Sequence, residues 1–291
     1  MLTPKKFAIP LSLLMITGLV IWWYNRTDPY IAPLPGAAEY GYQLISNTAD
    51  LYGPGGKINI RSNGMNCTNC HLDAGKHLHA IPLTTVYLQY PRFRERSGTT
   101  ETLHKRISDC FKRSLQSIAP DSNSREYGAI VSYLKWLSEQ SITDTMDRSP
   151  LPYMSRAADP DKGSRLYQLH CRRCHGSNGE GTKDADHMNF RYPPLWGTNS
   201  YSTGAGMYQL SKLARFIKQN MPFDKPVGTI KIQDEEAWDL AAFINSRERN
   251  TFDISRDWPV ISTKPVDYPF GPYTDTFSAA RHKYGPWLNM K

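Results

Sequence analysis

Two short cysteine–histidine motifs are the residues of this sequence best suited to chemistry. Both have the spacing Cys-x-x-Cys-His, and the two copies are Cys67, Cys70, His71 and Cys171, Cys174, His175. This spacing attaches c-type haem, because two thiols about one helical turn apart form the thioethers and the adjacent imidazole ligates iron. A zinc site would need four ligands closed around the metal, and a redox Cys-x-x-Cys pair does not require the histidine. The sequence therefore predicts two covalently bound haems with His71 and His175 as their proximal ligands.

A methionine is placed to complete the second haem. Met221 precedes Pro222, 46 positions after His175, in a loop between two expected helices. A thioether is the soft distal ligand that raises a haem potential. We expect Met221 to ligate the second iron; the alternative is a methionine that only packs in the core. Other candidates for this ligand are Met188, Met207, Lys218 and Lys225.

In the first half, the matching place is taken by the fifth cysteine. Cys110 follows His71 by 39 positions, within an expected helix over residues 101–116 started by Thr99 or Thr100. The helix buries an apolar stripe formed by Leu103, Ile107, Phe111 and Leu115.

Cys110 lies at the edge of that stripe, on the same side as Arg106 and Arg113. Neighbouring cations favour the thiolate, the form that ligates iron and acts as a nucleophile. We therefore expect Cys110 to be the distal ligand of the first haem; a buried packing thiol is the alternative.

The elements that must position these residues repeat along the chain. Each half has a haem motif, a helical stretch and an amphipathic closing helix, at 125–140 in the first half and 234–246 in the second. Strand signals are weak, with short β-like runs at 57–60 and 228–232. The sequence thus predicts a mainly α protein of two tandem cytochrome c-like domains, at 31–150 and 151–249. The proline-rich tail, 250–291, is expected to wrap over the surface.

The N-terminal 30 residues are predicted to form a membrane anchor. Lys5 and Lys6 precede eighteen uncharged residues, 7–24, which span about 27 Å as a helix. Aromatic residues end the stretch and no small-residue cleavage site follows, which favours an uncleaved anchor over a signal peptide. We expect a single-pass anchor in the cytoplasmic membrane, with the haem domains in the periplasm.

The amino-acid composition and the charge distribution argue against two other classes of protein. The chain has 291 residues, of which 40% are hydrophobic and 21% charged, which excludes a disordered protein. Its net charge is +8, but the cations are spread along the chain, so a nucleic-acid partner is not expected.

Several segments resemble the dihaem thiosulfate dehydrogenases. They are Asn66-Cys-Thr-Asn-Cys-His-Leu-Asp-Ala-Gly75, Tyr90-Pro-Arg-Phe-Arg-Glu-Arg96, Arg106-Ile-Ser-Asp-Cys-Phe-Lys-Arg-Ser114, Pro265-Val-Asp-Tyr-Pro-Phe-Gly-Pro-Tyr273 and His282-Lys-Tyr-Gly-Pro286. The resemblance covers nearly the whole chain after the anchor. One departure is Leu115-Gln-Ser117, where the family often has Asn-Gly after the Arg-Ser that follows the cysteine.

The resemblance implies two class I cytochrome c domains, a Cys-ligated haem at the active site and a second haem that passes electrons out. The implied reaction is 2 thiosulfate ⇌ tetrathionate + 2 electrons. By the same likeness, Arg106 and Arg113 bind the sulfur oxyanion beside Cys110, with a contribution from Arg92, Arg94 or Arg96. An external electron partner, either a small cytochrome c or a membrane redox protein, is also implied.

We hypothesise that Cys110 forms a transient Cys–S–SO3 species with one thiosulfate, in which the S–SO3 group is the whole thiosulfate bonded through its sulfane sulfur to the cysteine sulfur. A second thiosulfate then attacks that sulfane sulfur. Two other functions remain open. The protein could be a tethered electron carrier without substrate chemistry, or its site could act on a sulfur-carrier thiol.

Overall fold

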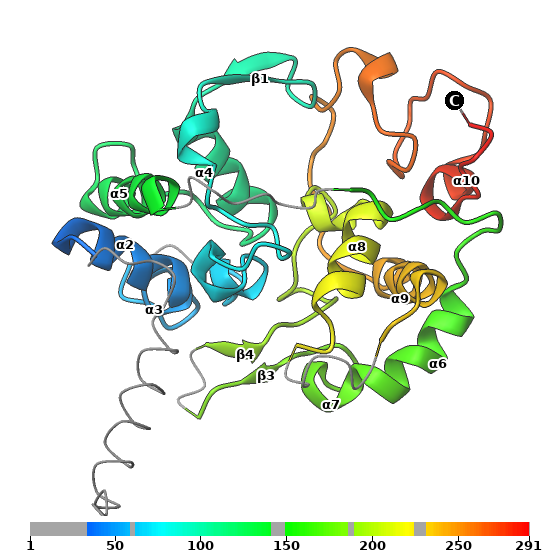
Figure 1. The fold of residues 1–291 in the computed structure, drawn as a ribbon, viewed down its shortest axis with the longest axis horizontal. Helices are drawn as coiled ribbons and strands as arrows, with labels where there is room; N and C mark the ends of the chain where they lie inside the picture. The colour runs from blue at the N-terminus through cyan, green and yellow to red at the C-terminus, as the bar shows by residue number, and fades with distance from the viewer. Residues whose placement is uncertain (1–33, 59–61, 141–148, 186–188, 224–230, 291) are drawn as a thin grey trace, which may run out of the picture.

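The computed structural model describes residues 34–58, 62–140, 149–185, 189–223 and 231–290. Most of the regular structure in these ranges is helical, as predicted, and the helices form two groups that lie side by side (Figure 1). The helices are α2 (Gly36–Ser46), α3 (Thr48–Tyr52), α4 (Leu103–Arg113), α5 (Arg125–Gln140), α6 (Pro160–His170), α7 (Arg172–His175), α8 (Leu210–Asn220), α9 (Asp234–Ser246) and α10 (Ala279–Tyr284). The closing helices α5 and α9 are found where the sequence predicts them.

Each domain is framed by two helices that cross at a glycine. In the first domain α2 packs on α5, and a Cβ atom on Gly41 would overlap the carbonyl oxygen of Ala129. In the second domain α6 packs on α9, and a Cβ on Gly163 would overlap the carbonyl oxygen of Asp239. Both crossings need a residue without a side chain. The equivalent contacts confirm that the two halves repeat one helical unit.

Helix α4, which carries Cys110, is shorter than predicted. Its N-cap is Thr102, whose hydroxyl accepts from the Lys105 amide, so the predicted start at Thr99 or Thr100 is wrong. The reason is that Thr99–Glu101 forms strand β2, which pairs antiparallel with β1 (Arg92–Arg94). The connecting turn contains Gly98 at φ +63°, a conformation that favours glycine.

A second small hairpin joins the domains. Strand β3 (Thr182–Lys183) pairs with β4 (Phe190–Tyr192), and Phe190 is buried in the core of the first domain. This hairpin was not predicted. The β-like runs expected at 57–60 and 228–232 form no strand in their described residues, and parts of both lie outside the described residues.

The C-terminal segment touches both domains. Residues 250–290 run mostly without regular structure, apart from α10 and one 3₁₀ turn (Ile261–Thr263). Near its start, the Trp258 amide donates to the carbonyl of Arg96 in the first domain (2.7 Å). Near its end, Trp287 is buried against Trp238 of α9 with ring centroids 4.9 Å apart.

No helix in the described ranges is long and apolar enough to cross a membrane. The predicted anchor at 7–24 lies outside the described residues.

Candidate functional site

The first haem motif is held in place by side-chain hydrogen bonds around a 3₁₀ turn, Cys67–Asn69. The side chain of Asn66 accepts from the Ala49 amide (2.8 Å), and Asn69 Oδ1 accepts from the Asn66 amide (2.8 Å). The hydroxyl of Thr48 contacts both the amide and the sulfur of Cys67. These bonds fix the direction in which the two thiols of the motif point.

The second motif lines a large apolar cavity. The cavity has a volume of about 460 Å³, within the range of small-molecule and cofactor sites. Its walls include Cys171, Cys174 and His175 of the motif, and also Met207 and Met221. Both methionines therefore reach the cavity, and Met221 does so from the C-cap of α8.

The other candidates for the second distal ligand are placed differently. The ammonium of Lys218 is bonded to Asp234 (2.7 Å) and to the Ile232 carbonyl (2.8 Å). Met188 and Lys225 lie outside the described residues.

The two motifs adjoin. Residues of the first motif and its continuation also line the cavity of the second; they are Thr68, Asn69, Cys70, Leu72 and Asp73. Groups bound at the two motifs are therefore neighbours in the interior of the molecule.

Both proximal histidines are oriented by a backbone carbonyl. His71 Nδ1 lies 2.5 Å from the Ile81 oxygen, and His175 Nδ1 lies 2.8 Å from the Pro193 oxygen. Because a carbonyl only accepts, each Nδ1 carries the proton and each Nε2 keeps its lone pair for a metal. Burial lowers the pKa of His71 to about 4 and also lowers that of His175, so both rings are neutral at physiological pH. These are the properties that haem iron requires.

Two of the motif cysteines, Cys70 and Cys171, are shielded from water by the surrounding protein. Burial raises the pKa of Cys70 to about 12 and that of Cys171 to about 12. Reduced, buried thiols beside an apolar cavity fit thioether attachment of a haem at each motif.

Cys110 lies where the sequence places it, on α4 toward the first motif. Its side chain is half-buried, and its charge raises the pKa of the motif thiols, with burial the larger cause for both Cys67 and Cys70. Cys110 is also the largest influence on the pKa of Arg106, which it raises. The structure therefore brings together the predicted ligand, the first motif and one of the two predicted arginines.

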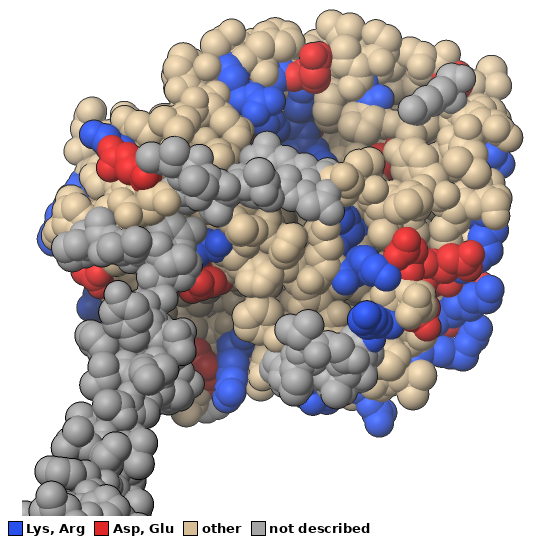
Figure 2. Space-filling view, in the orientation of Figure 1, with Lys and Arg blue, Asp and Glu red and all other residues tan. Residues whose placement is uncertain are grey.

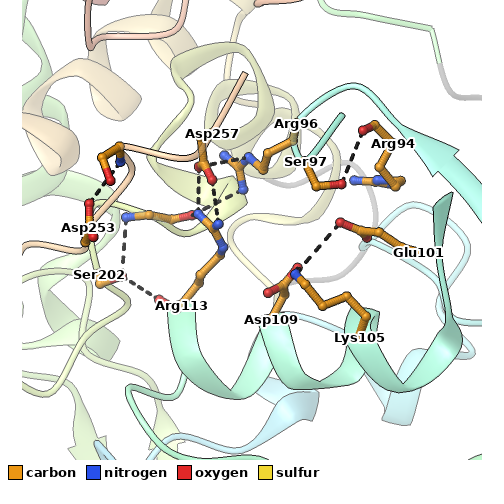
Figure 3. Close-up of polar contacts among 12 residues, drawn as sticks. Arg94, Arg96, Ser97, Glu101, Lys105, Asp109, Arg113, Ser202, Asp253 and Asp257 are labelled. Carbon is orange, nitrogen blue, oxygen red and sulfur yellow. Dashed lines mark hydrogen bonds and ion pairs between the residues drawn. The ribbon is translucent and has the colours of Figure 1, made fainter. Parts of the chain in front are cut away.

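The second predicted arginine has a different environment. Arg113 donates twice to Asp257, at 2.7 Å and 2.6 Å (Figure 3). Its guanidinium also lies 4.5 Å from the centre of the Phe252 ring. Burial is the largest single influence and works against its charge, but the hydrogen bond to Asp257 and the attraction of Asp257 and Asp109 together outweigh it, and the pKa of Arg113 is raised. Arg113 thus ties α4 to the C-terminal segment.

Arg96 joins the same carboxylate. Its Nε lies 3.5 Å from Asp257, and both Arg96 and Arg113 donate to the carbonyl of Gly204. Asp257 was not predicted, because nothing in the sequence relates it to arginines 144 and 161 positions earlier. Figure 2 shows Lys and Arg side chains gathered in a hollow between the β1–α4 region and the C-terminal segment.

Comparisons with known proteins agree with this geometry. Residues 59–142 match the family described as "SoxA/TsdA, cytochrome c domain", and residues 160–248 match "Cytochrome c". A thiosulfate dehydrogenase of Allochromatium vinosum is 36% identical over 238 residues, which cover 78% of this chain and 85% of that relative. The chain belongs to the thiosulfate dehydrogenase family. As in that family, the two cytochrome c domains bind two c-type haems covalently, in agreement with the prediction.

Two further family members extend the comparison. A thiosulfate dehydrogenase of Stutzerimonas stutzeri is 36% identical over 191 residues, covering 64% of this chain and 61% of the relative, so the chain spans under two thirds of that protein. The solved structure of thiosulfate dehydrogenase (TsdBA) from Marichromatium purpuratum, in its as-isolated form, has a TM-score of 0.64 and 32% identity. That match covers 75% of this chain and 47% of the other.

Proposed function

We propose that this protein is a dihaem oxidoreductase that interconverts thiosulfate and tetrathionate, releasing two electrons for every two thiosulfates joined. The observation that carries the proposal is that Cys110 lies beside Arg106 and next to the first haem motif. Family membership with curated thiosulfate dehydrogenases supports the substrate.

The cationic hollow in Figure 2 suits the charge of the substrates. Two thiosulfates bring four negative charges together, so the site must offset strong repulsion. Guanidinium groups bind such oxyanions with paired charge-assisted hydrogen bonds. In the described part of the chain, neither Arg94 nor Arg106 has an ion pair, so both are available to a sulfonate.

The bound haems supply two one-electron acceptors, held by the two motifs with Cys110 and Met221 as the remaining ligands. In the proposed reaction, the Cys110 sulfur bonds to the sulfane sulfur of the first thiosulfate as two electrons leave. The second thiosulfate attacks that sulfane sulfur, the bond to Cys110 breaks, and tetrathionate departs. Cys110 recovers the electron pair of the broken bond and returns as the thiolate.

The closeness of the two motifs supports the second haem as the electron exit. Because Asn69 and Cys70 of the first motif line the cavity of the second, electrons have a short interior route from the site to Met221. The external partner is then a redox protein, either a small cytochrome c or a membrane protein.

The experiment adds thiosulfate anaerobically to the oxidised protein and follows haem reduction by visible spectroscopy. We expect reduction in the wild type and none in Cys110→Ala or Cys110→Met, with two haems per chain in all three by pyridine haemochromogen assay. Near-normal rates in Cys110→Met would show that the thiol has no chemical role. Without thiosulfate reduction or tetrathionate oxidation in the wild type, an electron carrier becomes the better description.

We also propose that residues 7–24 anchor the protein in the cytoplasmic membrane with the haem domains in the periplasm. Lys5 and Lys6 before the apolar stretch support this orientation. Alkaline carbonate extraction of membranes tests it: the full chain is expected to stay in the pellet, and a chain with residues 1–30 replaced by a cleavable signal peptide in the supernatant. Release of the full chain would contradict the anchor.

A further inference from the structure

A lysine of the second domain, Lys212, lies close to arginines of the first. The Arg96 guanidinium lies 5.6 Å from the centre of the Tyr268 ring, and Asp267, the residue before Tyr268, binds the start of the helix that carries Lys212. Lys212 belongs to the first turn of α8, whose start is fixed by Asp267: Gln209 Nε2 donates to Asp267 Oδ1 (2.7 Å) and the Ser211 amide to its Oδ2 (2.9 Å). These bonds occupy both oxygens of that buried carboxylate. Lys212 is thereby held at a defined place while its own side chain stays exposed.

The charged groups around Lys212 come from three different elements. Arg94 and Arg96 belong to β1 and the turn after it, Arg106 to α4, and Asp267 to the C-terminal segment. Three of these four neighbours are cations. Within the described ranges, Lys212 has no hydrogen bond or ion pair through its side chain. An unpaired lysine facing three arginines is unfavourable for folding, and this arrangement is typical of a site that binds an anion.

The arginines near Lys212 differ in whether a carboxylate of the protein neutralises their charge. Arg96 and Arg113 share Asp257, so their charges are partly neutralised within the protein. Arg94 and Arg106 have no such partner, and two guanidinium groups do not balance the four charges of two thiosulfates. Lys212 supplies a third unpaired cation near these arginines.

We propose that Lys212 is a substrate-binding residue contributed by the second domain, and that its ammonium pairs with a sulfonate of thiosulfate or tetrathionate. The inference rests on the proposed function and extends it, because the anion site then spans both domains. The second domain would thus serve substrate binding as well as electron exit.

A pH dependence follows from the surroundings of Lys212. Desolvation by the surrounding protein groups is the largest cause that lowers the pKa of Lys212 to about 8; the nearby arginines lower it further, and Asp267 opposes them. As the pH rises through 8 in the free protein, Lys212 loses its proton and one attraction for the anion is lost. A bound dianion raises this pKa again, so the apparent affinity falls gradually with pH.

The test separates binding from turnover by using a chain that cannot react. Thiosulfate is titrated by calorimetry into the haem-loaded Cys110→Ala protein and into Cys110→Ala/Lys212→Met. One charge-assisted hydrogen bond predicts a Kd about tenfold higher without the lysine at pH 7, and a smaller difference at pH 9.5. Lys212→Arg should restore the affinity at pH 7 and remove the weakening above pH 8. Lys135→Met, a charge removed from exposed α5, is the matched control and should leave Kd unchanged.

In the active chain, Lys212→Met should raise KM by about the same factor and change kcat less. Equal Kd and KM in Lys212→Met and wild type, with the same pH profile, would overturn the proposal. If the lysine changes Kd as expected while the wild type neither oxidises thiosulfate nor reduces tetrathionate, the proposed function fails and the anion-binding role of Lys212 stands.

Discussion

Two arginines flank Cys110 on α4, yet their environments assign them different tasks. The largest electrostatic influence on Arg106 is Cys110, whereas Arg113 is held by Asp257 in two short hydrogen bonds. The sequence predicts that both lie beside the cysteine, since their spacing on a helix requires it. It does not distinguish them, because the partner of Arg113 is 144 positions away and only the path of the C-terminal segment brings it near.

Replacing Arg106 should impair the reaction and spare the fold. Arg106→Gln removes a guanidinium that has no ion pair in the described part of the chain, so stability should change by less than about 0.5 kcal/mol. Loss of charge-assisted bonds to the substrate should lower kcat/KM for thiosulfate about 10- to 100-fold. Steady-state kinetics and thermal unfolding of the same preparation check both parts. A large loss of stability with unchanged kcat/KM would reverse the assignment.

Replacing Asp257, in contrast to replacing Arg106, should destabilise the fold. The carboxylate is buried, with a side-chain exposure of 6%, and Asp257→Asn leaves two partly buried guanidinium groups without their counter-charge. Breaking a buried ion pair costs about 3–5 kcal/mol, so the urea midpoint should fall clearly. Asp253→Asn, an exposed carboxylate of the same segment, is the control and should unfold like the wild type. An unchanged urea midpoint in Asp257→Asn would show that the ion pairs of Asp257 with Arg96 and Arg113 do not stabilise the fold.

Among the secondary-structure elements, the spacing of apolar residues predicts the long helices α5 and α9 more accurately than the shorter elements. The apolar spacing of α5 and α9 gives both helices correctly, since each buries one face against a partner helix. The start of α4 is misplaced because Thr99–Glu101 pairs with a strand, and tertiary pairing overrides a plausible cap. Helices α2 and α6 were not predicted. Gly41 and Gly163 lie where these helices cross α5 and α9, and they are the sequence signal that the repeat extends to α2 and α6.

These two crossings allow a matched test. Gly41→Ala and Gly163→Ala should each destabilise by about 1–3 kcal/mol, because the new methyl group meets a backbone carbonyl that cannot move aside. Gly128→Ala, on α5 with nothing within 4 Å of its Cβ position, should instead stabilise by about 0.5–1 kcal/mol through helix propensity alone. Chemical unfolding measures all three. Stabilisation by Gly41→Ala would mean that α2 and α5 are not in close contact.

Across the whole molecule, side chains of one domain complete the interior of the other. Phe190 of β4 is buried in the first core, and Asn189 bridges Asn66 (3.0 Å) and Asp50 (2.7 Å) of the first domain. The C-terminal segment adds contacts to both domains. The internal repeat predicts two units but not this exchange, because it depends on a hairpin whose strands are only two and three residues long. Such an interface keeps the two haem motifs at a fixed separation.

Because Phe190 of the second domain is buried in the core of the first, the two domains should unfold as one unit. We expect a single calorimetric transition for the wild type, with equal calorimetric and van't Hoff enthalpies, although two-domain proteins often show two. Phe190→Ala removes the buried ring at a cost of about 3–5 kcal/mol and should also resolve two transitions, because the lost contacts lie between the domains. Phe216→Ala, in α8 and buried in the second core, should lower the transition temperature without splitting it. A single transition in Phe190→Ala would mean that Phe190 stabilises only its own surroundings and that the polar contacts and the C-terminal segment hold the domains together. Splitting in both variants would mean that the effect is not specific to Phe190.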